Sequence, residues 1–332
     1  MNIANNNLAT HFHISTRESK ILSKLNDKKG YLSVKAPLPA LDDAEDDRIP
    51  ALFSKVIDAH VHIFPDPLFS AVWKWFDRYG WHIRYQLTTT EILTFLLTRG
   101  LDHIVLFQYA HKPGMALYLN DYMVEKIEEF DKIEQFKGRI TGMATVFPGE
   151  DNAVDILETS FQKGLKGVKL HAHVQCFDIL SKEMEDIYKL CTKHALPLVI
   201  HAGREPGSPA YSCDPYQLCG AYKIEEVIRS YPMLKLCVPH LGMDEFDEYK
   251  SMIERYDNLW LDTAMALTDY LPMDNIPNLE LMRSDRIMYG SDFPNIPYAW
   301  DRELKALAAL NLSDEKIKDI CSKSAENFFS IK

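Results

Sequence analysis

Apolar and polar positions follow a regular pattern from residue 55 onward. Short runs rich in Val, Ile and Leu alternate with longer amphipathic stretches. Most runs are nearly continuous, as expected for parallel strands buried on both faces. They predict strands at 55–64, 102–109, 140–147, 167–172, 197–202, 234–240, 259–263 and 286–291. The amphipathic stretches predict helices at 120–136, 151–163, 181–194, 222–230, 244–256, 300–310 and 313–328.

Eight strands with intervening helices, spread over about 270 residues, predict an α/β fold of the (β/α)₈ TIM-barrel type. We assign the barrel to residues 51–332. A doubly wound open sheet is the alternative architecture. It is disfavoured because no Gly-rich dinucleotide motif or P-loop follows any predicted strand.

Residues 1–50 differ in character from the barrel and predict an N-terminal extension, partly helical or mobile. Ser15 and Glu18 have the spacing of a capping box, and the apolar residues after them predict a short helix at 16–26. The acidic run at 42–47 is expected to be a solvated loop.

The composition narrows the class of protein. The 332 residues include 37 Lys+Arg and 48 Asp+Glu, for a net charge of -11, which argues against a nucleic-acid or membrane binder. No apolar run approaches the ~20 residues that span a bilayer. The N-terminus lacks a signal-peptide core, so a cytoplasmic protein is expected. The six cysteines are scattered without a Cys-x-x-Cys pair, as expected for free thiols.

The first predicted strand ends in the sequence Asp58-Ala-His60-Val-His62. Because side chains alternate along a strand, His60 and His62 point the same way and are suited to chelate one metal ion. His11 and His13 have the same spacing, but they lie in the extension without a strand pattern. The motif therefore needs support from other strands.

That support comes from three later strand ends. His201 follows the fifth apolar run, His240 the sixth and Asp292 the eighth, each with a glycine nearby that lets the chain leave the strand. The carboxyl ends of barrel strands meet at one face, where active sites lie. Agreement among four strand ends predicts a metal site there.

These motifs, taken in order, resemble the amidohydrolase superfamily. The resemblance is greatest to its amidohydrolase-related branch, which includes small metal-dependent hydrolases and the aminocarboxymuconate-semialdehyde decarboxylase group. It spans roughly residues 55–329, including Gly-Val-Lys-Leu-His at 167–171 and Ser-Ala-Glu-Asn-Phe-Phe at 324–329. It is specific for fold and metal and poorly specific for substrate.

The resemblance implies that one divalent ion, most often zinc with manganese as an alternative, is bound by His60, His62, His201 and Asp292. It also implies that His240 stands beside the water that the ion activates. Three imidazoles and one carboxylate independently suit Zn²⁺. Asp292 would orient the water and accept its proton, and His240 would share that proton or stabilise an oxyanion.

The fourth predicted strand carries further candidates. Lys169 lies where two-metal members of the superfamily have a carbamylated lysine that bridges the ions. The alternatives are an ordinary salt bridge or a grip on an acidic substrate, and the single-metal form is usual in this branch. His171 shares a strand face with Lys169 and is expected to line the site, whereas His173 lies further into the loop.

Two other groups could contact a substrate. Arg204 follows the fifth strand and could clamp a substrate carboxylate, or form an ordinary salt bridge. An aromatic-rich segment after the first strand could cap the pocket, although such residues more often pack between helices. Its members are Trp73, Trp75, Phe76, Tyr79 and Trp81.

Three functions remain open from the sequence. The first is a metal-dependent hydrolase that cleaves a C–O or C–N bond of a small molecule with an activated water. The second is non-oxidative decarboxylation of a small carboxylic acid at the same site. The third is a catalytically silent barrel that binds a partner, which is disfavoured because every expected ligand position is filled. A homodimer is possible by resemblance to the branch.

Overall fold

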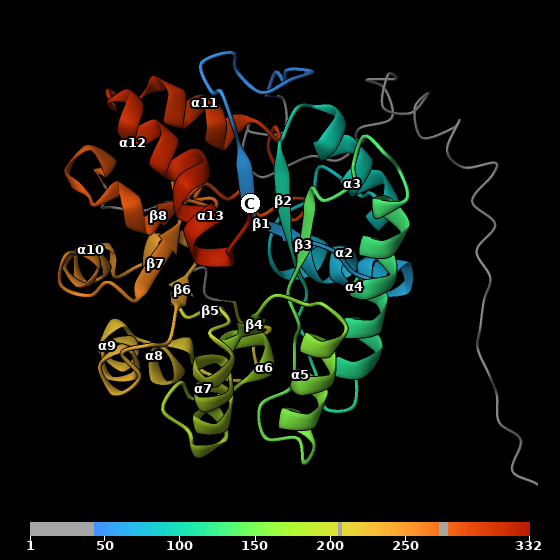
Figure 1. Cartoon of the computed structure of the whole chain (residues 1–332), viewed down its shortest axis with the longest axis vertical. Coiled ribbons are helices and arrows are strands. Elements are labelled where there is room, and N and C mark those ends of the chain that lie inside the picture. The colour runs from blue at the N-terminus through green and yellow to red at the C-terminus, as the bar shows by residue number, and fades with distance from the viewer. Residues whose placement is uncertain (1–42, 205–207, 272–277) are drawn as a thin grey trace, which may run out of the picture. The chain divides into compact units, whose positions relative to one another are not determined.

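The computed structural model describes residues 43–204, 208–271 and 278–332. The helix predicted at 16–26 and the histidines at 11 and 13 lie outside these residues. In the described part, parallel strands alternate with helices that lie outside them (Figure 1).

All eight predicted strands are present, and each is shorter than predicted. They are β1 (Ile57–His62), β2 (His103–Phe107), β3 (Ile140–Gly142), β4 (Val168–His171), β5 (Leu198–His201), β6 (Leu236–Val238), β7 (Leu259–Asp262) and β8 (Ile287–Met288). They pair in the orders β1-β2-β3 and β4-β5-β6-β7-β8. Parallel bridges from Ala144 to Val168 and from Val61 to Phe293 join the two groups. The strands therefore close into the predicted (β/α)₈ barrel.

Every helix that the sequence predicts within the described residues is present in the structure, together with others that it does not predict. They are α2 (Asp66–Tyr79), α3 (Thr89–Thr98), α4 (Ala116–Asp131), α5 (Ala153–Gln162), α6 (Ala172–Gln175), α7 (Lys182–His194), α8 (Pro215–Leu218), α9 (Ala221–Ser230), α10 (Phe246–Arg255), α11 (Arg302–Ala309), α12 (Asp314–Lys318) and α13 (Ser324–Phe329). Short 3₁₀ turns lie at His240–Gly242, Leu279–Leu281 and Ser284–Arg286. The helix predicted at 313–328 is interrupted by a π-helical segment, Asp319–Lys323. Helices α2 and α3 and the one-turn helices α6 and α8 were not predicted.

The barrel core is filled by inward-facing apolar side chains, and α13 closes its amino-terminal end. Phe328 packs its ring 5.1 Å from the Trp260 ring, measured between centroids. Lys55, just before β1, forms a 2.6 Å ion pair with Glu326. Because this helix plugs the end where strands begin, the other end stays available for a pocket.

The acidic run is an irregular and partly exposed segment, as its composition predicts, but some of its residues contact the barrel. Asp43 pairs with the guanidinium of Arg302 at 2.7 Å. The carbonyl of Asp46 accepts a hydrogen bond from the indole of Trp300 at 3.0 Å. These partners lie far along the chain, so local composition could not reveal them. Asp43 and Asp46 therefore hold this part of the segment against the barrel.

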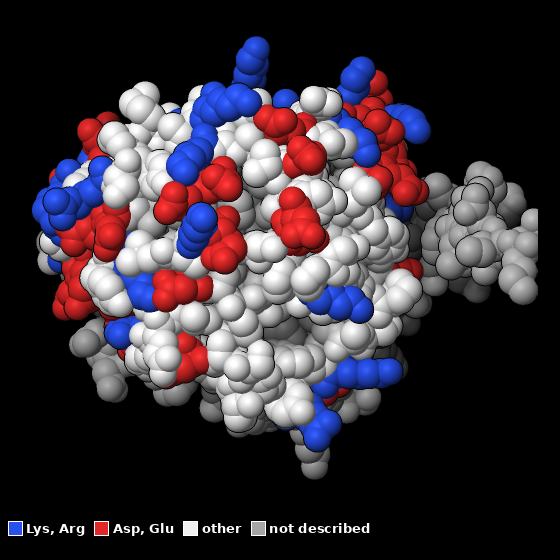
Figure 2. Space-filling model, turned by 90° about the horizontal axis from the view of Figure 1, so that it is seen from below, with Lys and Arg blue, Asp and Glu red and all other residues white. Residues whose placement is uncertain are grey.

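The described surface mixes both signs of charge. On the face shown in Figure 2, Lys and Arg side chains lie interspersed with Asp and Glu side chains. Among the described residues, no helix combines the length and apolar character needed to cross a bilayer.

Candidate metal centre

Three of the four predicted ligands converge at the carboxyl ends of β1 and β8. The Nε2 atoms of His60 and His62 lie 3.1 Å apart. The Oδ1 atom of Asp292 lies 3.3 Å from the first and 3.0 Å from the second. Gly290 permits this approach, because a Cβ there would lie 2.8 Å from the Cβ of His60. The three side chains form a compact, buried set of potential ligands.

The protonation pattern of this set suits a cation. His60 donates from Nδ1 to Oδ2 of Asp262 at 2.8 Å, so its Nε2 presents a lone pair. Burial lowers the pKa of His60 well below its usual value, which keeps the ring neutral. Burial alone would raise the pKa of Asp292, but His62 and His60 hold it at about 2, so the carboxylate is ionised. Neutral imidazoles and an ionised carboxylate are the forms that bind a divalent metal.

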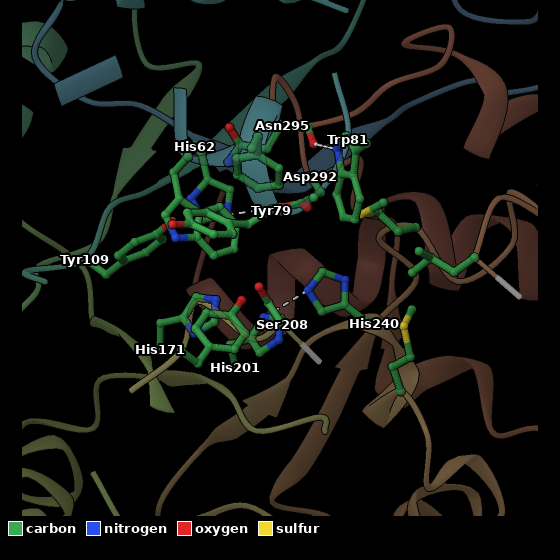
Figure 3. A pocket seen from close by; sticks show the side chains of 17 residues that line it. His62, Tyr79, Trp81, Tyr109, His171, His201, Ser208, His240, Asp292 and Asn295 are labelled. Atoms are coloured by element: carbon green, nitrogen blue, oxygen red, sulfur yellow. Dashed lines mark hydrogen bonds and ion pairs between the residues drawn. The ribbon is translucent and has the colours of Figure 1, made fainter. Parts of the chain in front are cut away.

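The other two predicted histidines form a second group across the pocket. His201 Nδ1 lies 3.1 Å from His240 Nε2. His240 donates from Nδ1 to the carbonyl of Ala264 at 2.7 Å, so its Nε2 carries the lone pair that can accept from His201 Nδ1. Figure 3 shows His62 and Asp292 on one side and His201 and His240 on the other. The structure thus gathers His60, His62 and Asp292 tightly and places His201 with His240.

The backbone at two of these positions is held in an uncommon conformation. His240 has φ of 58° and Asp292 has φ of 61°, both in the left-handed region. Such residues cost of order 1–3 kcal/mol and persist where the surroundings fix them. The two residues predicted to handle protons are therefore held in place by their loops rather than by regular strand geometry.

His171 and His173 lie beside His201, and the three could together be read as another metal site. However, the rings of His171 and His201 are stacked, with centroids 4.0 Å apart and planes 9° from parallel. An imidazole binds a metal through a lone pair in its ring plane, so two stacked rings do not direct lone pairs at one ion. The arrangement favours His171 as a wall of the pocket, as predicted.

Lys169 lies beneath the site and is fully buried. Its Nζ is 4.6 Å from the centroid of the Phe107 ring and has no hydrogen-bond partner among the described residues. Burial lowers its pKa to about 8, although Asp262 and Asp292 oppose that shift. A lysine of this kind is partly neutral near pH 8, as carbamate formation requires. The described pocket lining does not include Lys169, which disfavours a direct grip on substrate.

Arg204 does not reach the described pocket lining. Its guanidinium lies 3.0 Å from Asp244 and 3.3 Å from Glu245. The guanidinium carbon also lies 4.8 Å from the centroid of the Tyr216 ring. The structure therefore favours the salt-bridge alternative over the substrate clamp.

Aromatic side chains form much of the pocket wall. Trp75, Phe76, Tyr79 and Trp81 line the pocket from α2 and the loop after it. Trp73 does not; its ring stacks on Phe69 instead. The other lining residues include Gly80, Tyr109, Ser208, Tyr211, Met243, Met265, Leu271 and Asn295. The aromatic segment thus borders the site rather than packing only between helices.

Sequence reasoning missed Asp262, the last residue of β7. Its Oδ2 accepts from His60, while Oδ1 accepts from the backbone N–H of His240 at 2.9 Å. Burial raises the pKa of this carboxyl group, and His240 and Lys169 oppose the shift. An acidic residue at the end of the seventh apolar run was visible in the sequence, and His62, His171 and His201 end other strands in the same way. One carboxylate therefore connects the two halves of the site.

Comparison with known proteins gives the family. Among curated proteins, none matches the chain. Similar solved structures include an uncharacterised TIM-barrel protein from Bordetella bronchiseptica, with 14% identity, a TM-score of 0.63, and coverage of 83% of this chain and 98% of that one. Another is 5-carboxyvanillate decarboxylase from Novosphingobium aromaticivorans, complexed with manganese, with 16% identity, a TM-score of 0.56, and coverage of 87% and 99%.

A third is a protein assigned provisionally as 2-pyrone-4,6-dicarboxylic acid hydrolase from Pseudomonas putida. It has 17% identity, a TM-score of 0.57, and coverage of 84% of this chain and 99% of that one. At these identities the likeness shows the fold. The family model described as Amidohydrolase matches residues 57–331. That match spans the barrel and every proposed ligand, so the chain belongs to the amidohydrolase family.

Proposed function

We propose that this protein is a metal-dependent hydrolase that cleaves a C–O or C–N bond of a small molecule. The main support for this proposal is that His60 Nε2, His62 Nε2 and Asp292 Oδ1 lie within 3.3 Å of one another at the edge of a pocket. A divalent ion held by these residues would act as a Lewis acid and lower the pKa of a bound water to about 7. Zinc suits the donor set, and manganese is the alternative.

The chain's own residues would handle protons and position the substrate. Asp292 is ionised, so it can accept a proton from the attacking water. His240, held by the Ala264 carbonyl, lines the same pocket as Asp292, and its Nε2 can hold a proton for the leaving group. His201 lies beside it as the fourth proposed ligand.

The pocket wall indicates the substrate class. Trp75, Phe76, Tyr79 and Trp81 offer aromatic faces, and no lysine or arginine belongs to the described lining. Such a wall suits a planar, largely apolar molecule whose polar end reaches the metal centre. A lactone, ester or amide attached to a ring has this form.

The same wall supports a second candidate, decarboxylation of an aromatic acid. The carboxylate of such a substrate would be directed toward the ion, because the described wall offers no fixed cation to bind it. Two similar folds, 5-carboxyvanillate decarboxylase and 2,6-dihydroxybenzoate decarboxylase, are decarboxylases by name. The reaction needs a proton delivered to the ring carbon, a role that Asp292 or His240 could fill.

Metal content tests the shared part of both proposals. We expect about one zinc or manganese ion per chain, measured by elemental mass spectrometry after loading, and none in the double variant His60→Ala/His62→Ala. His194→Ala removes an exposed histidine on α7 and should leave the content unchanged. A wild-type chain that binds no ion under these conditions would remove the basis of the mechanism.

Isotope labelling separates the two reactions. Ring-bearing lactones, esters, amides and hydroxybenzoic acids would be incubated with the metal-loaded protein in H₂¹⁸O and in D₂O. Hydrolysis places ¹⁸O in the product without releasing carbon dioxide. Decarboxylation releases carbon dioxide and places deuterium on carbon, and that result would replace the hydrolase proposal with its alternative.

A further inference from the structure

Two cysteine thiols meet at one backbone carbonyl beside the pocket. Cys176 Sγ donates to the carbonyl oxygen of His173 at 3.4 Å. Cys213 Sγ donates to the same oxygen at 3.3 Å. Cys176 Sγ also lies 3.0 Å from the hydroxyl of Ser212, the residue before Cys213. The fold thus gathers two sulfurs that are well separated in sequence.

The pair differs from the other cysteines in exposure. Cys176 is exposed and Cys213 is half-buried, whereas the remaining four thiols are buried. Cys176 follows α6 with φ of 53°, and Cys213 precedes α8, so both lie at the ends of short helical turns. A bond between them would join two loop positions without crossing a strand. Neither thiol has a role in the proposed metal chemistry.

We propose that Cys176 and Cys213 form a reversible intramolecular disulfide when the folded protein meets a hydroperoxide. In the first step the Cys176 sulfur attacks the peroxide oxygen, giving a sulfenic acid and releasing water or an alcohol. The sulfur loses two electrons and the O–O bond gains them. In the second step the Cys213 sulfur attacks Cys176, the S–O bond breaks, and the proton of Cys213 leaves with the hydroxyl as water.

The order of the two steps follows from the surroundings of each thiol. Cys176 is the thiol that a peroxide in solvent can reach. Burial, and to a smaller extent the neighbouring Cys176, raises the pKa of Cys213 to about 12. Cys213 therefore remains a protonated thiol until the sulfenic acid has formed. Because the attacking species is the thiolate, ring closure should be faster at pH 9 than at pH 7.

The bond would act on one side of the pocket. The His173 ring packs 5.0 Å from the His201 ring and 5.3 Å from the Tyr211 ring, between centroids. Tyr211 lines the pocket two residues before Cys213. Joining Cys213 to Cys176 would fix the segment that carries Tyr211 relative to α6. The modification therefore lies where it could alter access to the site.

The test uses the full chain treated with hydrogen peroxide at pH 7 and pH 9, then alkylated with N-ethylmaleimide. We expect loss of two alkylatable thiols, a mass lower by about 2 Da before alkylation, and a Cys176–Cys213 peptide on a non-reducing map. Dithiothreitol should restore both thiols. Cys213→Ser should leave a sulfenic acid at Cys176 that dimedone traps, and the control Cys321→Ser should still form the bond.

Three results would overturn the proposal. One is oxidation of Cys176 to sulfinic acid while Cys213 stays free. Another is a disulfide between Cys213 and the buried Cys219, which also lies near it. The third is no loss of thiols within the time that a surface cysteine needs to react. Because the readout is mass and needs neither metal nor substrate, failure here is distinct from failure of the proposed function.

Discussion

The carboxylate of Asp262 gives the sharpest test of the metal centre. Its Oδ2 accepts from His60 Nδ1 at 2.8 Å, and its Oδ1 accepts from the backbone N–H groups of His240 and Ala264 at 2.9 and 3.2 Å. In Asp262→Asn, the carbonyl oxygen can keep the backbone contacts. The amide NH₂ then faces His60 Nδ1, so two donors oppose each other unless His60 moves its proton to Nε2.

The size of the effect follows from that proton. A protonated Nε2 on His60 has no lone pair for a metal and points toward His62 and Asp292. Loss of a partner that orients a metal-ligating histidine typically weakens binding by about 10–100-fold, or ~1.4–2.7 kcal/mol. Because the variant favours the wrong tautomer of His60 and does not only loosen the ring, we expect metal binding to weaken by about 100-fold. Flipping the amide would only transfer the conflict to the N–H of His240.

Competition with a chromophoric zinc chelator would measure the dissociation constant of each variant. Asp301→Asn is the matched control, since Asp301 is also a buried carboxylate but contacts the N–H of Asp46 and the amine of Lys305. It should lower stability and leave zinc affinity unchanged. A folded Asp262→Asn protein that binds zinc within about twofold of wild type would refute the assigned role.

Two further predictions concern stability. Gly242→Ala should lower Tm far more than Gly114→Ala, because an added Cβ would lie 1.9 Å from the Tyr249 ring at the first site and meets nothing within 4 Å at the second. The two glycines have similar φ angles of 77° and 79°, so the backbone strain of an alanine should be similar at both sites. Similar Tm shifts would therefore contradict the predicted effect of the contact with Tyr249. Burial lowers the pKa of His103 from 6.5 to about 4, so its neutral ring stabilises the fold above pH 6.5. That contribution, about 3 kcal/mol, should be lost as pH falls from 6.5 to 4. The variant His103→Gln can still form the hydrogen bond to Thr141. Urea unfolding should show that its free energy of unfolding falls less than that of the wild type over this pH range. Identical pH dependence of the two proteins would refute the prediction.

The sequence predicted the barrel because its signals are local. Each buried parallel strand is a short apolar run, and several of the runs end at or next to a proposed site residue. The spacing of His60 and His62 follows from the period of a strand, and Asp292 joins them as predicted. Helix α3 had a readable signal as well, since Thr88 and Glu91 form a capping box. It was missed because β-branched and aromatic residues in α3 do not give a clear helical period.

Tertiary structure decided the contacts between residues distant in sequence. The sequence offered Arg204 as a clamp for substrate, but its partners Asp244 and Glu245 arrive from the loop after β6. The acidic run around Asp43 reads as solvated, yet its partner Arg302 comes from α11 near the end of the chain. The charge of a side chain limits which partners it can bind. Which of these partners lies next to it is determined by the fold.

The same physical reason separates the chemistry that could be predicted from the sequence from the chemistry that could not. Strand ends determined which imidazoles and carboxylates face the pocket, because closing a parallel barrel brings those ends together. The orientation of His60 by Asp262 and the meeting of Cys176 with Cys213 depend on side-chain approach across different elements. Such approach depends on packing to within an ångström, which the order of residues along the chain does not specify.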